Sequence, residues 1–155
     1  MTYEEQISAV LDEFKDYMES ENDIKVLYDP QPVLIAEPHL RMTFTGAEEN
    51  GAFDKLKFQG SIVGSGDGPD VFLPAVIAMS MKVQDIWSAC RATNGRRWIE
   101  IPSKTGVLRI FFQSVQNSSG QFVQNEIYES EARQWAYTYA EPHVVVLEFR
   151  KEMQR

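Results

Sequence analysis

The first 20 residues place apolar and charged side chains with the period of an α-helix. Thr2 and Glu5 have the spacing of a capping box, in which the threonine hydroxyl accepts a hydrogen bond from the third helical residue. We therefore expect an amphipathic helix that begins after Thr2 and ends near residues 20–22. The predicted apolar stripe consists of Tyr3, Ile7, Val10, Leu11, Phe14 and Met18.

Period-two patterns predict strands in the next part of the chain. A short strand is expected over residues 24–28, ended by the prolines of the segment 29–32. Residues 39–45 alternate, and so do residues 55–62, with an acidic loop expected between them over Gly46–Asp54. The Asn50-Gly51 turn signal favours an antiparallel pair, and Gly60 would tolerate a bulge. The residues expected to face the core are Leu40, Met42, Phe44, Leu56, Phe58 and Ile62, with His39, Arg41, Thr43 and Thr45 on the polar face.

A glycine-rich break at Gly64–Pro69 precedes a second, longer helix. Asp70 is a suitable N-cap, Pro74 is tolerated near the start, and Asn94-Gly95 is a plausible end. The helix is apolar over a wide arc, so we expect it to pack across the sheet. Its predicted stripe is Phe72, Val76, Met79, Val83, Ile86, Trp87 and Cys90.

The pattern of the last third of the chain predicts strands. Turn residues at 103–106 separate two of them, and a hairpin turn is expected at Asn117–Gly120. The order of elements predicts one α+β domain spanning residues 1–155. We expect an antiparallel or mixed sheet with an N-terminal amphipathic helix and one long helix packed across it. The expected strands are 99–102, 107–115, 122–128, the alternating run at Trp135–Tyr139, and 144–149.

Charge is distributed unevenly along the 155 residues, whose formal net charge is −8. Residues 1–70 carry 15 acidic and 5 basic residues, whereas residues 71–155 carry 8 acidic and 10 basic residues. The acidic balance disfavours nucleic-acid binding, and the split would help one face of a subunit meet a different face of its neighbour. A requirement for solubility alone would also explain the uneven distribution of charge. The start of the chain is not a signal peptide and no run is apolar enough for a membrane span, so we expect synthesis in a cytosol.

Residues that carry chemistry are few. His39 and His143 are expected to be exposed or locally hydrogen-bonded, and Cys90 is expected to be a buried, inert thiol. They do not have the spacing of a zinc site. The segment Gly64–Gly68 lacks the lysine and hydroxyl of a phosphate-binding loop. We therefore predict no catalytic residue, no cofactor and no metal.

Two features indicate candidate interface residues: the uneven distribution of charge, and the many amides and aromatic residues in the last third of the chain. Amides mixed with aromatics are common where protein surfaces meet, although an ordinary hairpin with one packed face also explains them. Arg96 and Arg97 would meet the acidic half of a neighbour. The candidate interface residues are Glu48, Glu49, Arg96, Arg97, Phe122, Tyr137 and Tyr139.

The extended run from Pro38 ends in Thr45-Gly46-Ala47-Glu48, and an acidic stretch, a second strand and a long helix follow. This order, with an amphipathic helix in front, resembles the tail terminator proteins of long-tailed, lambda-type bacteriophages. The resemblance implies a structural virion protein, not an enzyme, made in the host cytoplasm and located at the head–tail junction. It implies a homohexameric ring that caps the tail tube and offers a surface to the head-completion protein.

Other classes of function stay open at this point. The acidic, aromatic-containing surface also fits a small protein-binding module, such as a phage-encoded inhibitor, or another head–tail connector protein. A small enzyme that uses Cys90 or a carboxylate cleft is the third class.

Overall fold

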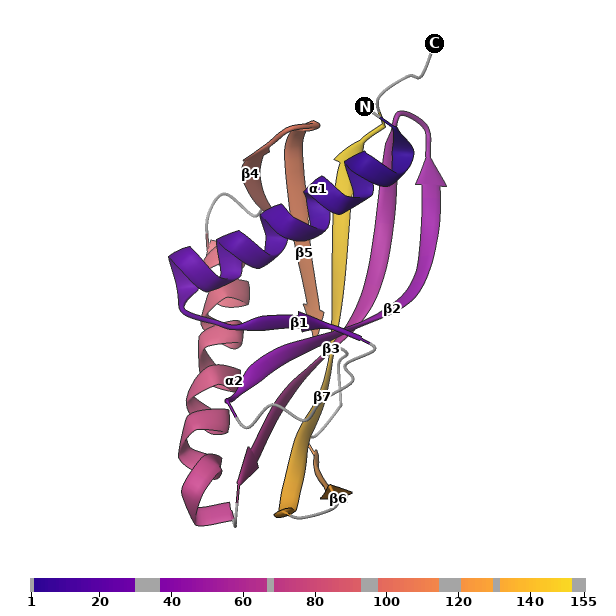
Figure 1. Ribbon diagram of the computed structural model, residues 1–155. Helices are drawn as coiled ribbons and strands as arrows, with labels where there is room; N and C mark the ends of the chain where they lie inside the picture. Colours follow the sequence, from indigo (N-terminus) through magenta and orange to yellow (C-terminus); the bar gives the residue numbers. More distant parts are fainter. Residues whose placement is uncertain are drawn as a thin grey trace.

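A mixed β-sheet, covered on one face by helices, forms the frame of the chain (Figure 1). The computed structural model describes residues 2–29, 37–66, 69–92, 98–114, 121–129 and 132–151. The presence of both helices and strands in one sheet-based unit confirms the predicted α+β class. The elements are α1 (Tyr3–Asp16), the π-helical η1 (Tyr17–Glu21), β1 (Val26–Tyr28), β2 (His39–Asn50), β3 (Phe53–Gly66), α2 (Pro69–Ala92), β4 (Ile99–Ser103), β5 (Gly106–Ser114), β6 (Gln121–Glu129) and β7 (Ala132–Arg150).

Helix α1 begins where the capping pattern predicted. The Thr2 hydroxyl oxygen accepts a 3.1 Å hydrogen bond from the backbone N–H of Glu5, which satisfies one free donor of the first turn. Val10, Phe14 and Met18 are fully buried, as their spacing predicted. Gln6 is also fully buried, which the apolar spacing did not indicate.

Strand β7 is the centre of the sheet. The strand order is β1-β2-β3-β7-β5-β4, and β6 pairs with β7 as well. Strand β1 runs parallel to β2 while the other pairs are antiparallel, so the sheet is mixed. Figure 1 shows α1 crossing in front of β5 and β7 and α2 running along one side of the sheet.

Strands β2 and β3 form a longer hairpin than the sequence predicted. The expected loop at residues 46–54 is wrong, because the ladder continues to the pair Asn50 and Phe53. Gly51, at φ 65°, and Ala52 form the turn. Glu48 lies 2.7 Å from Lys57 Nζ across the strands, so the charges that suggested a loop are paired on a ladder.

The break expected at Gly64 is also wrong, because β3 continues to Gly66, which pairs with Trp135 of β7. A bulge, which the sequence would tolerate at Gly60, is present as a shift of register between Gly60 and Ile62 against β7. Helix α2 starts at Pro69, one residue before the expected cap, and contains Pro74.

Both helices pack on the same face of the sheet. Val10 and Phe14 of α1 and Val76 and Val83 of α2 are buried in one core with the inward residues of the strands. The rings of Phe14 and Phe112 join α1 to β5, with centroids 6.3 Å apart. The opposite face carries no helix within the described ranges. The inward strand residues are Leu40, Met42, Leu56, Phe58, Ile62, Leu108, Ile110, Phe112, Val145, Leu147 and Phe149.

The hairpin expected between residues 107–115 and 122–128 is wrong. Strand β5 pairs with residues 143–149 of β7, whereas β6 pairs with residues 132–140 of the same strand. A strand of 19 residues is long enough to hold two partners end to end on one side. The expected turn at Asn117–Gly120 lies outside the described residues.

Two side chains differ from the alternation predicted for β2. Phe44 shares the face of Phe58, with ring centroids 5.6 Å apart, yet it is 55% exposed. Strand β1 ends at Tyr28, opposite Met42, so nothing flanks Phe44 at this edge of the described sheet. His39, expected on the polar face, is buried.

Candidate functional site

The outer surface of α2 is apolar between Pro74 and Met81. Ile77 is 43% exposed and Met81 is 59% exposed, although both are large hydrophobic side chains. Helical spacing places exposed small apolar residues beside them. We call this surface the apolar face of α2; it consists of Pro74, Ala75, Ile77, Ala78 and Met81.

This surface differs from that of an ordinary surface helix. Residues 71–81 contain no charged side chain, so from Pro74 to Met81 α2 is apolar on its outer side as well as on the buried side of Val76. A helix that is apolar all round is normally buried on every side. The apolar face of α2 is therefore a candidate contact for another protein surface.

Helix α1 has the opposite character on its outer side. Residues 3–21 carry seven carboxylates and one lysine, so most of the net charge of −8 lies on α1 and η1. The carboxylates of Glu4, Glu5, Asp12 and Asp16 belong to exposed residues. The helix layer thus presents an acidic surface on α1 and, from Pro74 to Met81, an uncharged surface on α2, after which the exposed Lys82 and Asp85 follow.

The second face of the sheet, which no described helix covers, combines aromatic and charged side chains. Phe111 packs beside Trp98 with ring centroids 5.7 Å apart, and Val107 is 43% exposed. The register places these residues opposite the core-facing set on β5. We call this surface the open sheet face; it consists of Glu48, Phe53, Lys55, Lys57, Trp98, Glu100, Val107, Arg109, Phe111, Glu148 and Arg150.

Arg109 is the centre of the open sheet face. Its guanidinium carbon lies 5.2 Å from the ring centroid of Phe53 and 5.8 Å from that of Trp98. Its Nη1 donates a 3.2 Å hydrogen bond to Glu148, which faces it across β5 and β7. Aromatic residues and arginine are enriched in protein interfaces, so this cluster is a second candidate contact surface.

Cations and carboxylates alternate on this face. The buried Glu148 also lies 3.7 Å from Lys55, and Glu100 lies 3.5 Å from Arg109. Arg150 is exposed and has no ion-pair partner among the residues that the structure describes. The open sheet face therefore lacks the negative excess of α1.

The sequence-predicted residues Glu48 and Glu49 lie near the tip of the β2–β3 hairpin and are exposed. Glu48 pairs with Lys57, and Glu49 lies 3.5 Å from Lys151. The hydrogen bond from Lys57, together with its charge, lowers the pKa of the Glu48 carboxyl below its ordinary value. Both glutamates are thus paired within the chain.

The aromatic candidates lie at the other end of β7. Phe122 and Tyr139 are register partners on β6 and β7, and Tyr137 pairs with Gly64 of β3. The register thus brings the three together around β6 and the first half of β7, at the opposite end of the sheet from the turn between β2 and β3 (Figure 1). Arg96 and Arg97 lie outside the described residues.

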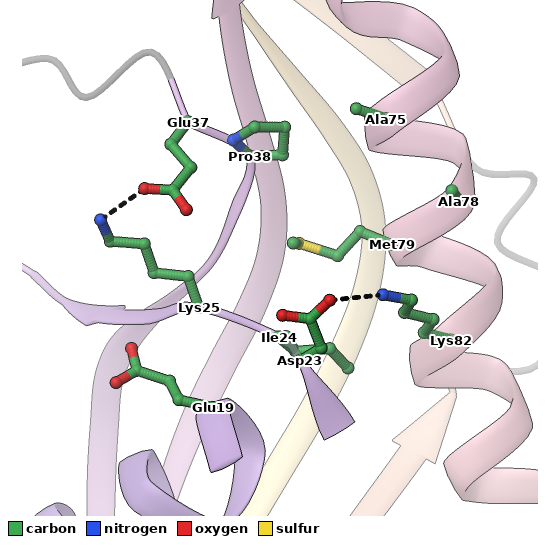
Figure 2. A pocket seen from close by; sticks show the side chains of 10 residues that line it. All are labelled: Glu19, Asp23, Ile24, Lys25, Glu37, Pro38, Ala75, Ala78, Met79 and Lys82. Carbon is green, nitrogen blue, oxygen red and sulfur yellow. Dashed lines mark hydrogen bonds and ion pairs between the residues drawn. The ribbon is translucent and has the colours of Figure 1, made fainter. Parts of the chain in front are cut away.

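A groove of about 540 Å³ lies between α2 and the segment that leads into β1 (Figure 2). Lys25 pairs with Glu37 at 2.8 Å, and Lys82 lies 3.4 Å from Asp23. Glu19 accepts a hydrogen bond from the backbone N–H of Val26. These charges are matched to one another, and Ala75 and Ala78 of the apolar face of α2 form part of the same wall.

The side chains considered as possible catalytic groups are those of His39, Cys90 and His143. His39 Nδ1 lies 2.9 Å from the backbone oxygen of Glu37, which confirms the local hydrogen bond, and burial lowers the pKa of its imidazole. Cys90 lies in α2 and His143 in β7, but their side chains lie outside the description. The described part of the chain contains no group of three potential metal ligands.

No helix among the described residues is long and apolar enough to cross a membrane.

Neither of the two candidate contact surfaces was predicted from the sequence. The uncharged run at residues 71–81 was a usable signal for the apolar face of α2. The open sheet face had no such signal, because Trp98, Arg109 and Glu148 come from three separate strand regions. A scan of protein-family models found no match to the chain, and a search of curated proteins found none either.

Proposed function

We propose that this chain is a structural subunit that assembles with copies of itself into a ring. We further propose that the ring is the tail terminator of a long-tailed phage or prophage, which caps the tail tube and offers a joining surface to the head. The observation that carries the proposal is the exposed apolar face of α2. A single copy leaves Ile77 and Met81 in water, and a neighbouring subunit would bury them.

The surface is suited to assembly because it is continuous and uncharged. It covers two turns of α2, from Pro74 to Met81, and it joins the groove beside β1. Full burial of a fully exposed side chain of this size is worth about 1.5–3 kcal/mol. Ile77 and Met81 are 43% and 59% exposed, so each would contribute roughly half of that to a contact. The tail-terminator identity rests on the resemblance of the Thr45–Glu48 motif and of the element order to that family.

The ring is tested by the mass of the protein in solution across protein concentration. We expect a discrete hexamer by light scattering and a closed ring in negative-stain electron micrographs. Met81→Glu places a charge on the apolar face of α2 and should give a monomer with an unchanged far-UV circular dichroism spectrum. Ser88→Glu is the matched control and should assemble as the wild type does, because Ser88 is exposed two turns after Met81 on the same side of the helix, past the end of the apolar face of α2.

Two results would contradict the proposal. If the Met81→Glu and wild-type proteins assemble alike, the apolar face of α2 is not the contact. If the wild type stays monomeric at every concentration, a ring formed by the chain alone is excluded, and the small acidic binding module becomes the better explanation.

A further inference from the structure

A closed ring needs two different surfaces on each subunit, because every copy contacts one neighbour through one surface and the next neighbour through another. The chain presents two dissimilar surfaces on opposite sides of its sheet, namely the helix layer and the open sheet face. We propose that neighbouring copies meet through these opposite layers, the helix layer of one subunit against the open sheet face of the next. This inference rests on the proposed ring and specifies its contact.

Charge favours this pairing over a symmetric one. Two helix layers facing each other would bring together two acidic surfaces, each with seven carboxylates and one lysine over residues 3–21. Like charges across an interface oppose association. The open sheet face instead presents Lys55, Lys57, Arg109 and Arg150, against three carboxylates, Glu48, Glu100 and Glu148. It is therefore the better partner for α1.

Apolar chemistry favours the same pairing. The apolar face of α2 exposes Ile77 and Met81, and the open sheet face exposes Val107 beside the Trp98–Phe111 pair. Methionine makes favourable contacts with aromatic rings, so the two surfaces are compatible in type.

The free edge of β2 is a poor alternative contact. Beyond Met42 this edge has no described neighbour, but it carries a register shift between Phe44 and Gly46 and the charged pair Glu48-Glu49. Bulges and charged residues are the features by which proteins prevent an edge strand from pairing with another chain. The contact is therefore assigned to the faces of the sheet and not to this edge.

Two variants that each damage one surface test the assignment. Met81→Glu damages the helix layer and Val107→Glu damages the open sheet face; both replace a half-exposed apolar side chain with a carboxylate. We expect each variant alone to be monomeric, with self-association weakened at least about tenfold. An equimolar mixture should form a discrete two-subunit species, because each variant retains the surface that its partner needs. Far-UV circular dichroism and thermal melting establish that each variant is folded.

A second pair, Ile77→Glu and Arg150→Glu, gives the same test if a member of the first pair fails to fold. The inference is overturned if Val107→Glu and Arg150→Glu assemble like the wild type, or if the mixtures remain monomeric while the wild type assembles. Those outcomes leave the proposed ring intact. A wild-type protein that never assembles would instead contradict the proposed function itself.

Discussion

The hydroxyl of Tyr3 donates a hydrogen bond to Asp54 Oδ2, which ties the first turn of α1 to the start of β3, 51 residues away in sequence. Asp54 is buried, and its other carboxylate oxygen has no hydrogen-bond partner among the described residues. The Tyr3 ring also lies 4.9 Å from Lys151 Nζ, just after β7. One tyrosine therefore joins both ends of the chain to the tip of the β2–β3 hairpin.

Removing the Tyr3 hydroxyl should destabilise the fold. Tyr3→Phe leaves the buried Asp54 carboxylate without this donor, which should lower the free energy of unfolding by about 1–3 kcal/mol. Urea denaturation measures the change. Tyr17→Phe is the matched control, since the Tyr17 hydroxyl makes no hydrogen bond to a described residue. Equal stability of the Tyr3→Phe and wild-type proteins would show that the bond contributes nothing.

Phe14 and Phe44 were both predicted to face the core, but replacing them by alanine should change the free energy of unfolding by different amounts. Phe14 is fully buried against Phe112, so Phe14→Ala should lower the free energy of unfolding by about 3–5 kcal/mol. Phe44 is 55% exposed and contacts Phe58 by its edge, so Phe44→Ala should cost about 1 kcal/mol or less. Denaturant titration of both variants decides the matter. Comparable losses would contradict the placement of Phe44 at an open edge.

The glycine at the start of β5 should be sensitive to a side chain. Gly106 has a φ of 107°, a backbone conformation that L-residues rarely adopt, although no atom crowds its missing Cβ. Gly106→Ala should therefore cost on the order of 1–3 kcal/mol through backbone strain. Gly46→Ala is the control, because that position is equally uncrowded and has no positive φ. Thermal melting should show a lowered midpoint for the Gly106 variant alone.

Acidification should weaken the fold through His39. Burial, opposed by the hydrogen bond to Glu37 and assisted by the charges of Arg41 and Lys25, lowers the pKa of His39 below its ordinary value of about 6.5. The unfolded chain then binds the proton more readily than the folded chain, so the stabilisation is complete above pH of about 6.5 and is lost as pH falls through the folded pKa. Denaturation curves between neutral and acidic pH measure this loss.

The His39→Gln variant should show a shallower decline of stability over the same pH range. Asp29, which raises the His39 pKa by its charge, works against the effect. A decline of the same slope in wild type and variant would assign the pH dependence to other groups.

The sequence alone determined the local elements of this protein. The Thr2 cap, the buried spacing of Val10, Phe14 and Met18, and the alternation of Leu108, Ile110 and Phe112 all depend on neighbours within a few residues. A period of 3.6 or 2 is read directly from such stretches. The α+β class followed from the order of these elements.

Only the tertiary structure decided how far the strands extend and what they leave uncovered. The polar segment at residues 46–54 became part of a ladder because β2 pairs with β3 as far as Asn50 and Phe53, and because β7, which is distant in sequence, supports β3 from Phe53 onward. The length of β7 and the order of the strands decide that β7 pairs with both β5 and β6. The short length of β1 leaves Phe44 exposed. The two candidate contact surfaces also depend on the tertiary structure, because whether a side chain is exposed is determined by which other elements pack against it.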